Sequence, residues 1–129
     1  MRPKILIIDD AESLRIALKG VLEDEDYDVD TVGTAVEGLA QAIDNAYDVV
    51  VTDLQLNGPK GLELNAGLEL VVELKHAKPQ LPVILMTAHH TTDVAIEAIR
   101  LGAYDYIFKE ADLPGELLKR VAKAVRDSR

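Results

Sequence analysis

The chain has 129 residues, a length that suits one domain with a single hydrophobic core, and 48% of its residues are hydrophobic, as is ordinary for a globular protein. Its formal net charge of −9 argues against direct binding of nucleic acid or of an anionic membrane by this segment. The absence of cysteine excludes disulfides and thiolate metal sites, and no apolar run is long enough to span a bilayer. A strand from residue 4 leaves no room for a signal peptide, so we expect a cytoplasmic protein.

Short apolar runs alternate with helical patterns along the chain. The runs predict buried strands at about 4–9, 28–33, 48–53, 82–87 and 104–108. Apolar residues at helical spacing predict helices at about 12–25 and 35–45, one that ends near 77, one closed by Gly102, and a last one from about Pro114. Thr34 and Glu37 have the spacing of a capping box. Five strands and five helices predict one doubly wound α/β domain over 1–129.

Polar residues follow four of the apolar runs. They are Asp9 and Asp10 after the first, Asp53 after the third, Thr87 after the fourth and Lys109 after the fifth. The carboxyl ends of parallel strands lie along one edge of a sheet, so we expect these side chains to meet there. Carboxylates without histidine or cysteine favour Mg²⁺, and an ammonium and a hydroxyl suit a phosphoryl group. Because a carboxylate can be a nucleophile, the set indicates formation of an aspartyl phosphate.

These residues carry a family resemblance. The matching motifs are Asp9-Asp10, Asp53 after Val49-Val50-Val51, Met86-Thr87-Ala88, and Tyr104 to Lys109. Over essentially its whole length the chain resembles the receiver domain of two-component response regulators. The resemblance implies a flavodoxin-like sheet of five parallel strands in the order 2-1-3-4-5, flanked by five helices. The segments from Thr87 to Tyr106 and from Glu116 to Val121 are most similar to receivers of transcriptional activators of the nitrogen-regulator type.

The resemblance implies a metal-assisted phosphoacceptor site. Asp53 is the expected phosphoacceptor and also a Mg²⁺ ligand. Asp10 is expected to bind Mg²⁺ directly, and Asp9 largely through water. The backbone carbonyl of Gln55 is a further expected metal ligand.

The resemblance further implies a switch. Thr87 and Lys109 are expected to contact the phosphoryl group, and the rotamer of Tyr106 to follow Thr87. The expected donor is a sensor histidine kinase, a phosphotransfer protein or a small acyl phosphate. Phosphorylation would reshape the face formed by the fourth helix, fifth strand and fifth helix, which would bind an effector domain, a second receiver or another downstream protein. The chain would be no enzyme, but a phosphoacceptor that takes part in its own phosphorylation and dephosphorylation.

Two positions depart from the family pattern. Glu110 stands where the family has a proline after its lysine, joined by a cis peptide bond. A cis bond to a non-proline residue costs about 2.5–4 kcal/mol, so the loop is either trans and rearranged or strained. We expect an altered lifetime of the phosphoryl group. The second departure is Asn57, which stands where family members usually have proline.

The loop after Asp53 also contains a tandem duplication. The hexamer from Gly61 to Ala66 is followed by Gly67 to Leu70, which repeat its first four residues, and the helix of usual length is expected to follow the insert. The insert would extend that helix by about 9 Å, at about 1.5 Å per residue, or bulge as a loop. It is interpreted either as a lid or partner-selecting ridge beside Asp53, or as a tolerated insertion, since added loop length is thermodynamically cheap.

Three other functions stay open at this point. A receiver-like module that binds partners without phosphate is the main alternative, and Glu110 is the residue that favours it. A Mg²⁺-dependent aspartyl-phosphate phosphatase would need an Asp-x-Asp motif, which Asp9-Asp10-Ala11 lacks. A flavin-binding domain would need a phosphate loop rich in Ser, Thr or Gly after the first strand, and the acids there would repel phosphate without a metal.

Overall fold

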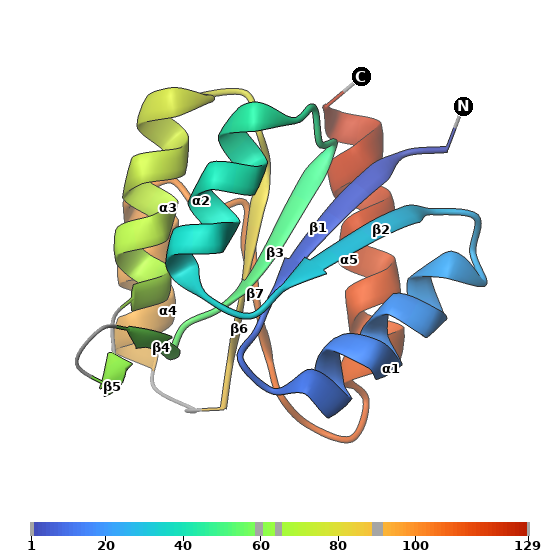
Figure 1. Ribbon diagram of the computed structural model, residues 1–129, viewed down its shortest axis with the longest axis horizontal. Coiled ribbons are helices and arrows are strands. Elements are labelled where there is room, and N and C mark those ends of the chain that lie inside the picture. The colour runs from blue at the N-terminus through green and yellow to red at the C-terminus, as the bar shows by residue number, and fades with distance from the viewer. Residues whose placement is uncertain (1, 59–60, 64–65, 89–91, 129) are drawn as a thin grey trace.

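A five-stranded parallel sheet forms the centre of the computed structural model, which describes residues 2–58, 61–63, 66–88 and 92–128 (Figure 1). Its strands are β1 (Lys4–Ile8), β2 (Asp28–Val32), β3 (Val49–Asp53), β6 (Val83–Thr87) and β7 (Asp105–Phe108). They lie in the order β2-β1-β3-β6-β7, and all four neighbouring pairs are parallel. Counted along the chain, this is the predicted order 2-1-3-4-5. All five carboxyl ends therefore meet at one edge.

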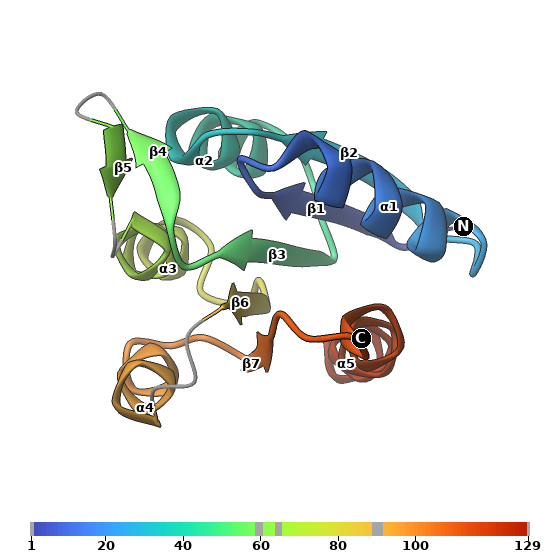
Figure 2. The ribbon, with the colours of Figure 1, turned by 90° about the horizontal axis from the view of Figure 1, so that it is seen from below.

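Helices cover both faces of the sheet. They are α1 (Glu12–Glu23), α2 (Ala35–Asp44), α3 (Ala66–Ala77), α4 (Thr92–Arg100) and α5 (Leu113–Asp127). Helices α1 and α5 lie on one face, and α2, α3 and α4 on the other (Figure 2). Successive strand residues alternate between the two resulting cores, because side chains alternate along a strand: Ile5 and Ile7 belong to the core under α1 and α5, and Leu6 and Ile8 to the other. None of the described helices has the length and apolar character needed to cross a membrane.

The predicted helix boundaries have local causes that the structure confirms. The hydroxyl of Thr34 accepts a hydrogen bond from the Glu37 backbone N–H at 3.1 Å, which caps the start of α2, and it pairs with the Glu37 carboxylate at 3.0 Å. Gly102 has φ +113° just after α4, a conformation that L side chains rarely adopt. Pro114 stands in the first turn of α5, where its missing N–H costs nothing.

The segment after Asp53 differs from both predicted forms of the insert. It forms a two-stranded antiparallel hairpin of β4 (Leu56–Gly58) and β5 (Gly61–Glu63), so the first half of the duplicated hexamer is a strand. Residues 64 and 65 lie outside the described residues. Residues 61–63 do not extend α3, because they pair with β4, whose Leu56 is fully buried; β4 in turn contacts α2 and α3. The chain must therefore leave this packed strand before it enters α3.

Candidate functional site

Three carboxylates meet at the carboxyl edge of the sheet, where β1 and β3 end. Asp9, Asp10 and Asp53 each offer one carboxylate oxygen, and the three oxygens lie within 4.8 Å of one another. Asp9 and Asp53 are buried, whereas Asp10 is partly exposed. Close carboxylates repel one another, and an all-oxygen ligand set suits a hard cation such as Mg²⁺. The donor set thus fits the metal that the sequence predicts.

Lys109 joins two of these carboxylates from the end of β7. Its Nζ lies 2.8 Å from Asp9 Oδ2 and 2.9 Å from Asp53 Oδ2. Burial raises the pKa of Asp53, the Lys109 ammonium acts in the opposite direction, and the charge of Asp9 adds to the rise. Burial acts to lower the pKa of Lys109, but its hydrogen bonds to the two carboxylates outweigh that effect and the pKa is raised. Lys109 therefore stays charged beside Asp53.

Backbone hydrogen bonds hold the strand ends in place. The N–H of Lys109 donates to the Thr87 carbonyl at 2.8 Å, and the N–H of Leu54 donates to the Met86 carbonyl at 2.8 Å. Asp53 of β3 is the register partner of Met86 in β6. Thr87 is the residue that follows Met86, and it is 1% exposed. The backbone N–H of Gln55 approaches Asp53 Oδ1 at 3.4 Å. The strand ends thus bring Asp9, Asp10, Asp53 and Lys109 together, with the backbone of Thr87 bonded to that of Lys109.

Sequence reasoning missed Arg15 as part of this site. Its Nη1 donates a 2.7 Å hydrogen bond to the backbone carbonyl of Asp9, while Asp9 Oδ1 accepts from the Ala11 N–H at 2.9 Å. Asp9 is therefore held at its carbonyl and at both carboxylate oxygens, whereas Asp10 has no hydrogen-bond partner among the described residues. The only signal is a cation six residues after Asp9, at the end of the first turn of a predicted helix.

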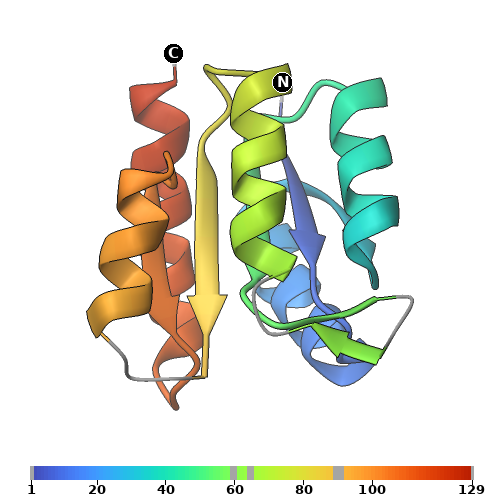
Figure 3. The same cartoon turned by 90° about the vertical axis from the view of Figure 1, so that its left-hand side faces the viewer.

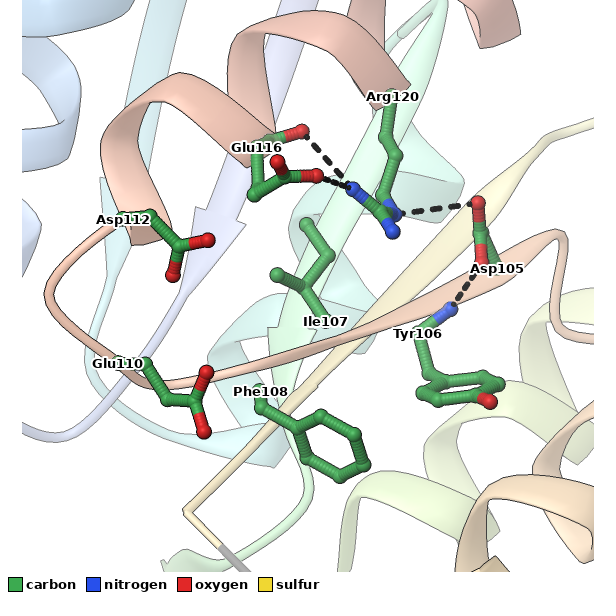
Figure 4. A pocket seen from close by; sticks show the side chains of 8 residues that line it. All are labelled: Asp105, Tyr106, Ile107, Phe108, Glu110, Asp112, Glu116 and Arg120. Atoms are coloured by element: carbon green, nitrogen blue, oxygen red, sulfur yellow. Dashed lines mark hydrogen bonds and ion pairs between the residues drawn. The ribbon is translucent and has the colours of Figure 1, made fainter. Parts of the chain in front are cut away.

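Tyr106 lies outside the carboxylate cluster. Its half-buried ring packs edge-on against Phe108, with ring centroids 5.7 Å apart. Figure 4 shows both residues at a pocket of about 320 Å³ between β7 and α5. On the opposite side, Arg120 bonds the Glu116 carboxylate, and its Nε lies 3.3 Å from Asp105 Oδ2. The hydrogen bond from Arg120 lowers the pKa of Glu116. This pocket is part of the face that the sequence predicts to change on phosphorylation.

The loop after β7 contains the predicted departure at Glu110. No cis peptide bond occurs among the described residues, so the Lys109–Glu110 bond is trans. The Glu110 N–H donates to the Phe108 carbonyl at 3.0 Å, and the Leu113 N–H donates to the Glu110 carbonyl at 3.0 Å. Of the two forms expected from the sequence, the loop takes the trans one, and it still delivers Lys109 to Asp53.

A doubly wound domain with an acidic site and a lysine at its carboxyl edge is the architecture of a receiver, and comparisons with known proteins agree. Residues 5–122 match the family described as the response regulator receiver domain. The chain is 34% identical over 125 residues to the response regulator protein PilR of Pseudomonas aeruginosa, covering 97% of this chain and 26% of PilR. It is 32% identical over 124 residues to a putative NtrX-like response regulator of Rickettsia bellii, covering 95% of this chain and 25% of that protein.

Structure comparison gives the same result. The solution structure of the beryllofluoride-activated NtrC4 receiver domain dimer superposes with a TM-score of 0.85 at 28% identity, and the match covers 98% of both chains. The chain belongs to the response regulator receiver domain family, the phosphoacceptor signalling domains of two-component systems. Its NtrX-like and NtrC-like relatives are consistent with the predicted nitrogen-regulator type. It spans only about a quarter of the length of the two curated relatives.

Proposed function

We propose that the chain is a phosphorylation-activated switch in which Asp53 accepts a phosphoryl group from a phosphohistidine of a sensor kinase or phosphotransfer protein. The observation that carries this proposal is the contact of Lys109 Nζ with Asp53 Oδ2 at 2.9 Å beside two further carboxylates. An oxygen of Asp53 would attack phosphorus, forming the O–P bond as the N–P bond to the donor imidazole breaks. Phosphoryl transfer needs mainly positioning and charge neutralisation, and this edge of the sheet supplies both.

The proposed metal site consists of Asp10, Asp53 and the Gln55 backbone carbonyl, with Asp9 acting largely through water. A bound Mg²⁺ would neutralise the carboxylates and the transferred phosphoryl oxygens. Asp10 is the ligand least engaged with the protein, because Asp9 already bonds Lys109 and the Ala11 N–H. The ammonium of Lys109 is placed to neutralise charge that develops on the phosphoryl group.

The output of the switch would pass through Thr87 and Tyr106. The Thr87 hydroxyl would donate to a phosphoryl oxygen, and the Tyr106 ring would move inward and reshape the face formed by α4, β7 and α5. An effector domain or another downstream protein would read this change, in a protein that acts in the cytoplasm. We propose that residues 1–129 form a single receiver domain and that nucleic acid is not bound by this segment.

Intact mass after incubation with Mg²⁺ and acetyl phosphate tests the proposal. We expect a gain of about 80 Da that is labile to base and absent from Asp53→Asn. Asp44→Asn, a change of an exposed aspartate on α2, is the matched control and should gain the same mass. No gain with several donors, while Mg²⁺ still binds, would favour the receiver-like module that binds partners without phosphate.

A further inference from the structure

An apolar stripe runs along the outer side of α2. Val36 is 73% exposed and Ile43 is 45% exposed, and exposed Ala40 lies between them at helical spacing. Three apolar residues at positions i, i+4 and i+7 form one face of a helix. A buried partner is the usual reason for such a face, and within the described residues this stripe has none.

A groove lies beside this stripe, between α2 and α3, and Val36 belongs to its lining. It encloses about 170 Å³, and its floor includes Leu39, Ala66 and Leu70. Figure 3 shows the two helices side by side, with the β4–β5 hairpin at the end that is nearer the carboxyl edge of the sheet. Strand β4 contacts both helices. This strand begins at Leu56, three residues after Asp53 in the chain.

The rim of the groove is acidic and unneutralised. Glu69 and Glu73, which line it from α3, are exposed, one helical turn apart and without an ion pair among the described residues. Helix α2 contains Glu37 and Asp44 but no lysine or arginine.

Among the described residues, the lysines of α3 and of the turn after it do not offset this charge. Lys75 Nζ donates to the Pro79 and Leu81 carbonyls at 2.8 and 3.0 Å. Lys78 Nζ donates to the Ala42 and Asn45 carbonyls at 2.6 and 2.7 Å. Both ammonium groups are therefore held at the far ends of the helices, away from the glutamates of the rim.

We propose that the surface formed by the α2 stripe and the groove between α2 and α3 docks a basic amphipathic helix of a partner protein. Apolar anchors at positions i, i+3/i+4 and i+7 of that helix would cover Val36, Ala40 and Ile43, as in other helix-in-groove complexes. Lysines or arginines one turn apart would meet Glu69 and Glu73. A second copy of this chain is disfavoured because each copy has a net charge of −9, and an anionic lipid surface or nucleic acid is repelled for the same reason.

A designed peptide of about 18 residues, about 27 Å long as a helix, is a suitable probe. It carries leucines on one face and lysines on the other, and its matched control carries glutamates in place of the lysines. With the isotopically labelled chain, we expect the lysine peptide to shift the amide resonances of Val36, Ala40 and Glu69 with saturable binding. The glutamate peptide should shift none of them.

Charge reversal tests the rim. The double change Glu69→Lys and Glu73→Lys should weaken binding of the lysine peptide about tenfold or more. Glu23→Lys with Asp24→Lys changes the net charge equally at the end of α1 and should weaken binding less than about twofold. Equal losses in the two variants, or shifts centred on the pocket of Figure 4, would overturn the proposal.

Self-association is the remaining alternative occupant. Sedimentation of the wild-type chain and of Val36→Asp distinguishes self-association from binding of a partner helix. A wild-type dimer that Val36→Asp abolishes would assign the groove to a second copy and reject the partner helix. The test does not depend on phosphoryl transfer, since Asp53→Asn should bind the lysine peptide as the wild type does. A failure of the peptide to bind would therefore reject the docking groove alone, and a failure to gain mass with acetyl phosphate would reject the proposed phosphoacceptor alone.

Discussion

Gly67 lies so close to Asp53 that a Cβ at Gly67 would come within 2.3 Å of the Asp53 backbone carbonyl oxygen and 2.6 Å of the Leu54 Cα. The Gly67 N–H also donates to the Leu54 carbonyl at 2.8 Å. The first turn of α3 is thus seated directly on the strand end that presents the proposed phosphoacceptor. Of the two glycines that the duplication provides, Gly67 makes this contact, while Gly61 belongs to β5.

Gly67→Ala should therefore destabilise the fold and disturb the site. The clashing atoms are backbone, which cannot rotate away, so we expect a loss of about 1–3 kcal/mol in the free energy of unfolding, measured by urea denaturation. Gly20→Ala is the matched control, because a Cβ at Gly20 in α1 meets nothing within 4 Å. That change should stabilise the chain by about 0.4–1 kcal/mol. Equal effects of the two changes would contradict the close approach.

Asp10→Asn should reduce Mg²⁺ affinity while leaving the fold intact. Asp10 is partly exposed and makes no hydrogen bond among the described residues, so its carboxylate is free for a metal. Loss of an outer-shell partner typically costs about 10–100-fold in metal affinity, and we expect at least that effect from loss of a direct ligand. Calorimetric titration with Mg²⁺ measures it, and Glu12→Gln provides a nearby control. Unchanged affinity would remove Asp10 from the proposed metal site.

The Tyr47 hydroxyl gives the fold a stabilising contribution that depends on pH. It donates to Asp30 Oδ2 at 2.6 Å, and burial followed by this hydrogen bond raises its pKa to about 12. An unfolded tyrosine has a pKa of about 10. The contribution is therefore complete below pH 10 and is lost as the pH rises through about 12. Urea denaturation across this range should show a steeper loss of stability in the wild type than in Tyr47→Phe, and parallel profiles would argue against it.

Deletion of residues 61–66 tests whether the insert selects partners. The deletion removes β5 but retains Gly67, whose contact with Asp53 positions α3, so we expect the chain to fold and to accept a phosphoryl group from acetyl phosphate. Kinase preference, compared by transfer from several phosphorylated sensor kinases, should change if the hairpin is a partner-selecting ridge. Unchanged preference and phosphoryl lifetime would instead indicate a tolerated insertion.

The parallel sheet and most of the site could be predicted because their signals are local or follow from topology. Alternating apolar runs and caps such as Thr34 mark the elements, and parallel pairing alone brings Asp9, Asp53 and Lys109 to one edge. The hairpin could not be predicted, since β4 is held by burial of Leu56 and by contacts with two helices, which no local sequence pattern indicates. The bond from Arg15 to the Asp9 carbonyl was equally hidden, because it depends on the rotamer of one side chain.

Glu110→Pro should slow both gain and loss of the phosphoryl group. Proline has no N–H, so the 3.0 Å bond from Glu110 to the Phe108 carbonyl disappears and the loop that carries Lys109 shifts. Displacement of the Lys109 ammonium from Asp53 weakens charge stabilisation in the transition states of both reactions. Glu110→Gln removes the charge but keeps the backbone, and should retain rates within about twofold of the wild type. Phosphorylation and dephosphorylation rates, measured by intact mass for both variants, distinguish an effect of the backbone from an effect of the charge. Slowing in Glu110→Gln alone would assign the effect to the carboxylate.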